Sequence, residues 1–596
     1  MCRIAGIIDK NLNQLELEDG VRKMCTAMHK GGPDGEGYQY FNELNFAFGH
    51  RRLSLIDLSE NGAQPMNYES KLWITFNGEI YNYLELKADL VEKGCTFKNQ
   101  TDTEVILAGY KIYGTSFFNA LSGMFAFALF DSSLGKTYLV RDSAGIKPLY
   151  YCKANEGLYF ASEVKAFKAI NSQWAENEDW KIYFLLFGFV PEPYTTLKNV
   201  YSLPKGHYLC LNHYNSTVEI ISFLAQKSVN PSDTNKALLI KEKLDKAVER
   251  HLISDAPIGI FLSGGIDSSL LSLIAHQKHL NKIKTVSINF QETDFSESVY
   301  QDIIVKKIDS EHVSKIVTLA DFEKNIDRIF QDMDQPSNDG INSWFVNEIA
   351  SKSGLKAVLS GIGADEIFGG YPSFKRHGMI KLLKKFPRFL LKSAKYLPGD
   401  KLKRISFLAL KNPVGEYLFL RGFYTSNIVS KLLGVPEEKI NTLLENYKLD
   451  PAVDQLNAED RISWFETNVY MQNQLLKDTD YMSMAHGIEV RVPFLDKELL
   501  NAATSLSTEK RFKKQPKGLL IEAYKNILPE AIWNRQKKGF TFPFQKWFFS
   551  YEPMLTESNY SANEQALKLV KQFKQGKLHW SKLFAVYQIF HRAKKG

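Results

Sequence analysis

Two apolar segments that each run into a glycine turn constrain the fold of this chain more than any other feature. "APIGIFLSGG" (256–265) and "LKAVLSGIG" (355–363) have the composition of buried strands, and helical patterns such as "SSLLSLIAHQKHL" stand between them. Alternation of apolar strands with helices is typical of a parallel, doubly wound sheet. Because ligands of such sheets bind beyond the carboxyl ends of the strands, both glycine turns are candidate binding loops.

The chain before these segments has a different pattern. "KLWITFNGEIYN" (71–82) and "MFAFALFD" (124–131) predict strands, and "DTEVILAGYKIYG" (102–114) predicts a helix. The polar stretch "QKSVNPSDTN" (226–235) is the best candidate for a linker. Since 596 residues exceed what one hydrophobic core organises, we expect at least two domains.

Cysteine use and hydropathy favour a cytoplasmic protein. The apolar run from Ile182 to Pro191 is about half of the ~20 residues that span a bilayer, so it predicts a buried helix. We expect no membrane span, and no secretory leader precedes Cys2. The cysteines are odd in number, widely spaced and without a CxxC pair, which disfavours a disulfide framework or a zinc site. They are Cys2, Cys25, Cys95, Cys152 and Cys210.

The net charge of +8 is concentrated in one segment. Residues 375–411 hold twelve Lys or Arg and one acid, Asp400, so the rest of the chain is slightly acidic. A chain of this kind is not built as a general nucleic-acid binder, and we expect no nucleic-acid partner. A solvated, amphipathic helical arm is the simplest interpretation of the segment. The alternatives are a docking site for an anionic acceptor, a partner protein or an acidic surface.

The chain opens with "MCRIAGI", which places a cysteine second. Removal of Met1 would leave Cys2 with a free α-amine beside its thiol, and this is a nucleophile that carries its own base. On the residue alone, an ordinary buried cysteine is the more common role.

The segment "FLSGGIDSS" (261–269) predicts a strand, a glycine turn and the start of a helix. Backbone N–H groups at such a helix start cradle anions, most plausibly a phosphate. The loop is neither a Walker A loop nor a GxGxxG turn, and a plain serine-capped turn is the alternative. Asp267 would repel a phosphate unless a divalent cation lay between them, which indicates Mg²⁺. The loop "LSGIGADEIFGGY" offers Asp365 and Glu366 in a similar setting.

Together these motifs resemble those of the glutamine-hydrolysing asparagine synthetase family. The resemblance implies an α/β chain with an N-terminal-nucleophile αββα sandwich, the glutaminase domain, at 1–225. A doubly wound, parallel-sheet ATP-pyrophosphatase domain with a helical C-terminal part would follow at 236–596, carrying a basic helical insertion at about 375–460. The motifs, in order, are "MCRIAGI", "GPDGEG", "RRLSLIDLSENGAQPM", "FNGEIYN", "TDTEVIL", "LSGMFAFALFD", "GIKPLYY", "FLSGGIDSS", "LSGIGADEIFGGY" and "MSMAHGIEVRVPFLD".

For the first domain the resemblance implies a glutaminase centred on Cys2. The side chain of Asn77 and the backbone N–H of Gly78 would stabilise the oxyanion. Arg52 would clamp the glutamine α-carboxylate, a task that suits its planar fork. Outside the motif, Arg52, Glu79 and Asp102 would be taken for surface ion pairs. The implied glutamine-binding residues are Arg52, Leu53, Ser54, Leu55, Ile56, Asn77, Gly78, Glu79 and Asp102.

For the second domain the resemblance implies an ATP site with magnesium. Asp267 and Asp365 resemble the metal ligands, and Lys517 in "KGLLIEAY" resembles the lysine that stabilises the adenylation transition state. The implied ATP-binding residues are Leu262, Ser263, Gly264, Gly265, Asp267, Ser268, Ile288, Ser360 and Gly361.

The implied reaction consumes glutamine, ATP and aspartate. A carboxylate attacks the α-phosphorus of Mg-ATP and expels pyrophosphate, and ammonia released at Cys2 then displaces AMP to give an amide. The ammonia would travel along a sheltered path between the domains, because bulk water would protonate it. A homodimer is the expected assembly.

The sequence departs from the family pattern in three places. The family's "HRGPD" is "KGGPD" here, and "RDSAGIKPLYY" has Ser143 and Ala144 where larger residues are usual. The sharpest departure is Ile362, which replaces a glutamate credited with acid–base work near the activated carboxylate. Either another residue, such as Glu366 or Glu348, takes that role, or the acceptor is not aspartate.

Three other functions remain to be weighed against asparagine synthesis. A ligase that amidates another carboxylate, such as a sugar acid or a secondary metabolite, is the nearest alternative. A plain glutaminase with a decayed synthetase half is disfavoured by the intact "SGGIDSS" and by Asp365. A polyanion-binding protein is disfavoured because the chain outside the basic segment is net acidic.

Overall fold

The structure is a computed structural model, and it describes residues 2–154, 157–170, 174–224, 235–278, 282–512, 515–536, 539 and 541–595. The linker predicted at 226–235 lies outside the described residues except for Asn235. Among the residues described, no helix is both long and apolar enough to cross a bilayer.

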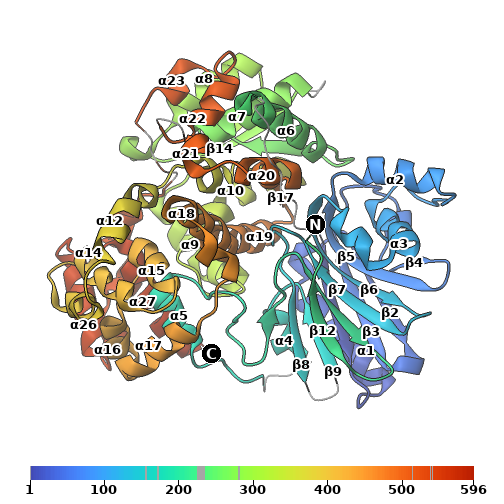
Figure 1. Ribbon diagram of the computed structural model, residues 1–596, viewed down its shortest axis with the longest axis horizontal. Coiled ribbons are helices and arrows are strands. Elements are labelled where there is room, and N and C mark those ends of the chain that lie inside the picture. The colour runs from blue at the N-terminus through green and yellow to red at the C-terminus, as the bar shows by residue number, and fades with distance from the viewer. Residues whose placement is uncertain are drawn as a thin grey trace.

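The N-terminal part is a sandwich of two six-stranded antiparallel sheets covered by helices on both outer faces (Figure 1), as predicted. The strand order is β10-β8-β9-β1-β3-β2 in one sheet and β12-β11-β7-β6-β5-β4 in the other. The strands are β1 (Arg3–Ile8), β2 (Gly35–Phe41), β3 (Phe46–Arg52), β4 (Met66–Tyr68), β5 (Leu72–Ile80), β6 (Gly123–Asp131), β7 (Lys136–Arg141), β8 (Tyr150–Ala154), β9 (Gly157–Ala161), β10 (Tyr201–Ser202), β11 (His207–Asn212) and β12 (Val218–Ser222).

Apolar side chains on both faces of the strands explain this layering. Ile4 and Phe48 pack between the sheets, whereas Ile7 of β1 faces outward against α1 (Gln14–Ala27) and α4 (Lys165–Ile170). Helix α3 (Asp102–Tyr113) covers the other sheet together with α2 (Tyr83–Glu92). The central strands are therefore buried on both faces, and β12 is exposed at an edge.

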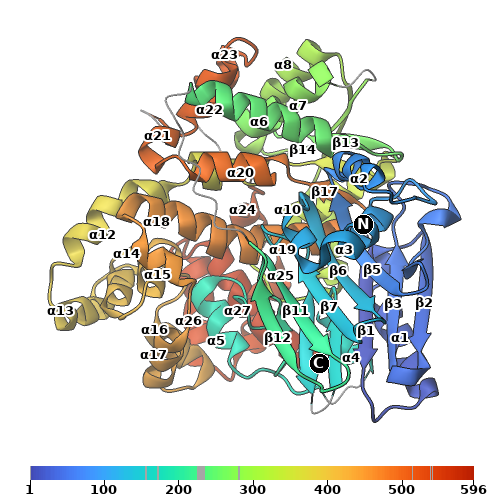
Figure 2. The same ribbon diagram turned by 45° about the vertical axis from the view of Figure 1, so that its right-hand side comes forward.

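The second part contains the predicted parallel sheet, with five strands in the order β15-β14-β13-β16-β17. The chain order reverses where β13 pairs with β16, so a topological switch point lies there. Figures 1 and 2 show α6, α7 and α8 above this sheet and α10 below it. These elements are α6 (Lys236–His251), β13 (Ile258–Phe261), α7 (Ile266–Lys278), β14 (Lys284–Asn289), α8 (Ser298–Ile308), β15 (Glu311–Ile316), α10 (Ile341–Lys352), β16 (Ala357–Leu359) and β17 (Glu489–Arg491).

The remaining elements are almost all helical. After η5 (Thr293–Phe295) and α9 (Leu319–Asp332) they include α11 (Ala364–Phe368), η6 (Pro372–Arg376), α12 (His377–Leu383), α13 (Arg388–Ser393), η7 (Ala394–Tyr396), α14 (Asp400–Lys403), η8 (Arg404–Ala409), α15 (Val414–Arg421), α16 (Ser426–Leu433), α17 (Glu437–Asn446) and η9 (Pro451–Gln455). Towards the end of the chain they include α20 (Lys497–Thr504), α21 (Thr508–Phe512), α22 (Gly518–Tyr524), α23 (Glu530–Trp533), α24 (Phe544–Phe548), α25 (Glu552–Leu555), η12 (Glu557–Tyr560), α26 (Glu564–Lys574) and α27 (Trp580–Lys595).

Of the apolar run predicted as a buried helix, Ile182 to Phe187 is helical, because α5 (Trp180–Phe187) ends before Gly188, which has φ of 90°. Helix α5 packs among helices of the C-terminal part (Figures 1 and 2). The backbone N–H groups of Phe423 and Tyr424 donate to the carbonyls of Leu186 and Leu185, at 2.8 and 3.1 Å. The N-terminal half of the sequence thus contributes an element to the core of the C-terminal half.

One long helical stretch passes from the helical part to the sandwich. Helix α18 (Ala458–Phe465) continues as a π-helix, η10 (Glu466–Leu476), and then as α19 (Lys477–Met484). π-helices are rare and are frequent at functional sites. Asp480 of α19 pairs with the fully buried Arg3 at 2.8 Å, next to Cys2.

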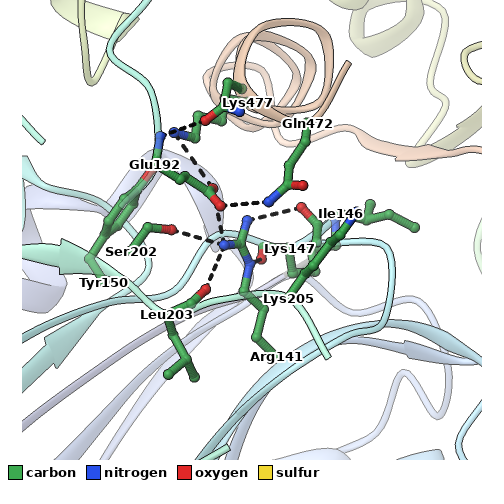
Figure 3. A network of polar contacts seen from close by, with 12 residues as sticks. Arg141, Ile146, Lys147, Tyr150, Glu192, Ser202, Leu203, Lys205, Gln472 and Lys477 are labelled. Atoms are coloured by element: carbon green, nitrogen blue, oxygen red, sulfur yellow. Dashed lines mark hydrogen bonds and ion pairs between the residues drawn. The ribbon is translucent and has the colours of Figure 1, made fainter. Parts of the chain in front are cut away.

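A buried polar network joins η10 and α19 to the sandwich (Figure 3). The guanidinium of Arg141 donates to Glu192 at 3.0 Å and to the hydroxyl of Ser202 at 2.9 Å, as well as to three backbone carbonyls. Gln472 of η10 donates to the second oxygen of Glu192 at 2.6 Å, and Lys477 lies 3.6 Å from the first. Burial opposes the charge on Glu192, but Arg141 and Lys477 hold the pKa of its carboxyl below the ordinary value.

Replacing Arg141 by methionine should destabilise the protein, because Glu192 would keep its burial and lose its main counterion. Removal of one partner of a buried pair costs about 3–5 kcal/mol. The free energy of unfolding in urea measures this loss. The exposed cation Lys71 in the same part of the chain provides the control, since Lys71→Met should change stability by less than about 0.5 kcal/mol. Equal stability of the two variants would contradict a structural role for the network.

Candidate active sites

The predicted nucleophile lies at the mouth of the sandwich, directly before β1. The thiol of Cys2 is buried, and its Sγ is 3.9 Å from the carbonyl oxygen of Leu53. Burial raises the pKa of the Cys2 thiol, while the nearby Arg52 guanidinium acts in the opposite direction. A buried thiol of this kind needs a base beside it before it can attack a substrate.

Asn77 and Gly78 lie on β5, which contacts β1 across the sandwich. Asn77 is fully buried, and among the described residues neither its Oδ1 nor its Nδ2 has a hydrogen-bond partner. Such an orphaned amide is costly unless a ligand completes it. Gly78 has φ of 154°, and a Cβ there would lie 2.1 Å from the carbonyl oxygen of Met124, so no other residue fits. The pair can supply donors to an oxyanion formed beside the thiol.

The predicted segment from Arg52 to Ile56 meets the thiol of Cys2 at the carbonyl oxygen of Leu53. The guanidinium of Arg52 is held by the loop that follows, because it donates to the carbonyls of Asp57 and Ser59. A substrate carboxylate would therefore bind its remaining N–H groups. Leu53 and Leu55 are buried, Ile56 is half-buried, and the backbone N–H of Ser54 donates to Asp34 at 2.9 Å.

Glu79 and Asp102 form a buried acidic pair to which the second part of the chain contributes a cation. Burial raises the pKa of Asp102 to about 7, although its carboxylate accepts from the N–H of Ile80 at 2.9 Å. Burial and the nearby Glu489 raise the pKa of Glu79 well above its usual value. Arg491 of β17 lies 3.4 Å from Glu79 and 2.6 Å from Glu489. An ammonium group that entered this pocket would favour the ionised form of both carboxyls.

A second site lies at the carboxyl ends of β13, β14 and β16, where a cavity of about 260 Å³ opens. Of the residues predicted to bind ATP, Gly264 and Gly265 turn the loop beside the cavity. The others line it: Leu262, Ser263, Asp267, Ser268, Ile288, Ser360 and Gly361. Asp365 lines it as well.

The glycine loop is held in shape by its own serines. Gly264 has φ of 82°, and a Cβ there would lie 3.0 Å from the side chain of Tyr300. The hydroxyl of Ser268 accepts from the N–H of Ser263 at 3.1 Å, and that of Ser263 accepts from the N–H of Gly265 at 3.3 Å. An arriving phosphate would replace these hydroxyls as acceptor for the same N–H groups.

Asp267, Asp365 and Lys517 meet at one point beside the cavity. The ammonium of Lys517 lies 2.5 Å from Asp267 and 2.6 Å from Asp365, and burial opposes its charge while the two carboxylates raise the pKa of Lys517. Lys517 directly precedes α22 and has φ of 60°, which is unusual for a residue with a side chain. Gly361 permits this meeting, because a Cβ there would lie 2.8 Å from the Cβ of Asp267.

These residues fit a magnesium–nucleotide complex. Two carboxylates that converge on one cation match the usual protein contribution to Mg²⁺, which is one or two carboxylates completed by phosphates and water. Among the described residues, no cluster of three or more His, Cys, Asp or Glu has the arrangement of a metal site. The phosphates would therefore complete the coordination.

The cavity distinguishes the two glutamates that could replace the one absent at Ile362. Glu366 lines the cavity together with Ile362, accepts from the hydroxyl of Tyr371 at 2.6 Å, and has its pKa raised to about 7 by burial and by Asp365. Glu348 does not line it; its carboxylate pairs with Lys315 and Lys352 at 3.4 and 2.8 Å. Of the two glutamates, only Glu366 lies where it could act on a ligand in the cavity.

Asp339, Asn347 and Asp478 are among the cavity residues that the sequence did not predict. Asp478 is buried, and burial together with Asp339 raises the pKa of its carboxyl well above the usual value. Asn347 is fully buried, and its Oδ1 has no hydrogen-bond partner within the described ranges. Ionisable residues within the otherwise apolar segment "LLKDTDYMSMA" could have identified Asp478 as a candidate site residue from the sequence.

Comparisons with known proteins cover nearly the whole chain. A family model described as glutamine amidotransferase domain matches residues 1–221, and one described as asparagine synthase matches residues 239–579. Glutamine-hydrolyzing asparagine synthetase 1 of Bacillus subtilis is 32% identical over 563 residues, which cover 92% of this chain and 88% of that protein. Glutamine-hydrolyzing asparagine synthetase 3 of the same organism is 29% identical over 97% of this chain and 91% of its own. Amidase chry2 of Gibberella zeae is 25% identical over 87% of this chain and 84% of its own.

Replacing Asn77 by alanine should lower kcat for glutamine hydrolysis by about 10²–10³-fold, because an oxyanion would lose a preorganised donor. Glutamate release measures this rate. Asn67→Ala, at an exposed position of β4, is the control and should leave the rate unchanged. A loss of less than tenfold in the Asn77 variant would rule out the amide as the main donor.

A second prediction concerns Glu366. Because its pKa is about 7, Glu366→Gln should remove a pH-dependent increase in pyrophosphate release near pH 7 and slow the reaction by about 10²-fold. Both enzymes are assayed at each pH with ammonium as the nitrogen source. Their rates are compared as a ratio, because the titration of ammonia affects both rates equally. Glu348→Gln should keep the full pH profile. A Glu366 variant that retained the increase would exclude this carboxyl as its origin.

Proposed function

Since this chain belongs to the family of glutamine-hydrolysing asparagine synthetases, we propose that it makes an amide from a small carboxylate, using Mg-ATP and the amide nitrogen of glutamine. It is an enzyme of that family. The observation that carries the proposal is the pairing of two sites in one chain. The first holds a buried thiol, with an orphaned amide on β5, a strand that contacts β1 directly after Cys2; in the second, two carboxylates and a lysine converge beside a glycine loop.

The first half of the reaction would release ammonia. In the mature chain, the α-amine of Cys2 takes the thiol proton, and the thiolate attacks the side-chain amide of glutamine. Asn77 and Gly78 hold the oxyanion, and the thioester that remains after ammonia leaves is hydrolysed to glutamate. Arg52 receives the α-carboxylate, while Glu79 and Asp102 receive the α-ammonium of the substrate.

The second half would activate the acceptor. Its carboxylate oxygen attacks the α-phosphorus of ATP, pyrophosphate leaves, and ammonia then displaces AMP from the acyl-adenylate to give the amide. Leu262, Ile288 and Ser360 would hold the nucleoside, and the N–H groups of the glycine loop would hold phosphate oxygens. Asp267 and Asp365 would hold Mg²⁺, which neutralises phosphate charge when bound. Lys517 would move from the carboxylates to the phosphates as these arrive.

Aspartate is the first candidate for the acceptor. Two of the relatives that match over nearly the whole chain are called asparagine synthetases. Their identities of 32% and 29% leave room for another acceptor, and one relative of similar coverage is called an amidase.

A second candidate, a carboxylate rich in hydroxyl groups such as a sugar acid, is favoured by the charge of the cavity. Asp339, Glu366 and Asp478 line it together with the two proposed metal ligands, and none of the described lining residues is Lys or Arg. Aspartate would bring a second carboxylate, and Lys517, the cation described beside the cavity, is already paired with Asp267 and Asp365. Hydroxyl groups would instead donate to the carboxylates and to the orphaned Oδ1 of Asn347.

Pyrophosphate release with Mg-ATP and glutamine, measured across a panel of acceptors, separates these candidates. The panel holds aspartate, succinate, galacturonate and glucuronate at millimolar concentration, and the amide product is identified by mass. Asparagine formation would establish the first candidate. Release with a uronate but not with aspartate would establish the second candidate. Release with none of the four acceptors would leave only glutamine hydrolysis and would contradict the proposed ligase.

Two variants check the assignment of the sites. Cys2→Ala should abolish glutamine use and keep ammonium-dependent pyrophosphate release, because the two sites are separate. Asp267→Asn should do the reverse, retaining most of the glutaminase activity. A Cys2 variant that still hydrolysed glutamine would show that the nucleophile is a different residue.

A further inference from the structure

Eight large apolar side chains are exposed within one short stretch of the helical part. They lie on α12, α13 and α14 and in the turns between these helices, and each is between 40% and 78% exposed. Large exposed apolar patches are rare on soluble proteins unless they bind a partner. They are Met379, Leu382, Phe386, Phe389, Leu390, Tyr396, Leu397 and Leu402. We call residues 377–403 the basic edge.

The basic edge has its own inward-facing anchors, so the exposed side chains are not needed for its core. Ile380 and Leu391 are buried in the main hydrophobic core, and Ala394 is buried as well. Lys384 pairs with Glu416, and Lys395 lies 3.1 Å from Glu437. The short helices are thus fixed from beneath, while Phe389, 69% exposed, and Tyr396, 78% exposed, face away.

Cations surround these apolar side chains. In the wider segment 375–411, four of the twelve basic side chains contact an acid or a backbone carbonyl: Arg376, Lys384, Lys395 and Arg404. For the other eight, no ion pair is formed with any described residue: Lys375, Lys381, Lys385, Arg388, Lys392, Lys401, Lys403 and Lys411. The single acid, Asp400, is paired with Lys582. The edge therefore presents positive charge that the protein itself leaves uncompensated.

The basic edge lies at the periphery of the molecule. Figures 1 and 2 show α12 and α14 on the side opposite the antiparallel sandwich, and in Figure 2 α13 is among the outermost elements. A projecting edge can meet a flat surface without a clash from the rest of the fold.

We propose that the basic edge binds the surface of an anionic lipid bilayer. Phe386, Phe389 and Leu390 would enter the boundary between headgroups and acyl chains, as the apolar face of an interfacial helix does. Lysines and Arg388 around them would contact anionic headgroups, and their aliphatic stems would add to the buried apolar area. The enzyme would then sit on the membrane without crossing it.

A lipid surface fits better than the other anionic partners. Nucleic-acid phosphates would use the cations but would leave eight exposed apolar side chains without a role. The rest of the chain is slightly acidic and would repel a long polyanion beyond the edge. An acidic protein would have to match apolar groups spread over three short helices, whereas a fluid headgroup layer adapts to them.

Flotation of the full-length protein with lipid vesicles tests the proposal. The vesicles are phosphatidylcholine alone, or phosphatidylcholine with about 30 mol% phosphatidylglycerol. We expect binding to the second kind only, weakening as NaCl rises from about 0.1 M to about 0.5 M. Phe386→Ser/Phe389→Ser and Lys385→Glu/Arg388→Glu should each lower the partition coefficient by at least about tenfold.

Matched variants elsewhere on the surface serve as controls. Leu15→Ser removes a side chain that is 77% exposed on α1, and Lys306→Glu/Lys307→Glu reverses two exposed charges on α8; both should bind within twofold of the unmodified protein. Unchanged glutaminase activity verifies that each variant is folded. If the unmodified protein did not float with anionic vesicles, the proposal would be wrong. If the charge variant lost binding and the phenylalanine variant kept it, a general polyanion site would replace the lipid site.

Discussion

The parallel pairing of β13 with β16 is the constraint on which the second site depends. It places two glycine loops, far apart in the sequence, at one edge of the sheet, and thereby brings Asp267 next to Asp365. Gly361 lets the loops approach, since any Cβ there would meet that of Asp267 at 2.8 Å. Two carboxylates this close would repel each other in a low-dielectric site, and the ammonium of Lys517 relieves the repulsion.

A second set of buried charges joins the two halves around the first site. Arg491 links β17 to Glu79, and Asp480 links α19 to Arg3 beside Cys2. Because α19 also carries Asp478 into the cavity, one helix both lines the second site and pairs with the residue next to Cys2. Such pairs add little net stability compared with apolar packing. They fix the relative position of their members, because a buried charge without its partner is energetically costly.

Local pattern in the sequence predicted the parallel sheet and several single elements, whereas the antiparallel sandwich was implied by the resemblance to the family. The strand patterns at 71–82 and 256–265 correspond to β5 and β13, and the apolar run after Lys181 corresponds to α5. The partners of α5 could not be predicted, because hydropathy shows that a helix is buried and not which core it enters. Asp339 and Asn347 could not be predicted either, because they reach the cavity through tertiary packing and belong to no recognisable motif. Lys517 was singled out only by its resemblance to the family, and the structure explains its place through two ion pairs.

Lys517 gives the nucleotide site a built-in counterion. Before any ligand arrives, its ammonium already lies between the carboxylates of Asp267 and Asp365 and offsets one of their two negative charges, which reduces the repulsion between the loops. We expect a magnesium–nucleotide complex to exchange with the lysine at these two carboxylates. In the proposed reaction, that exchange frees an ammonium next to the phosphates at the moment when negative charge begins to build there. Binding of the nucleotide and placement of the lysine for catalysis are therefore one step.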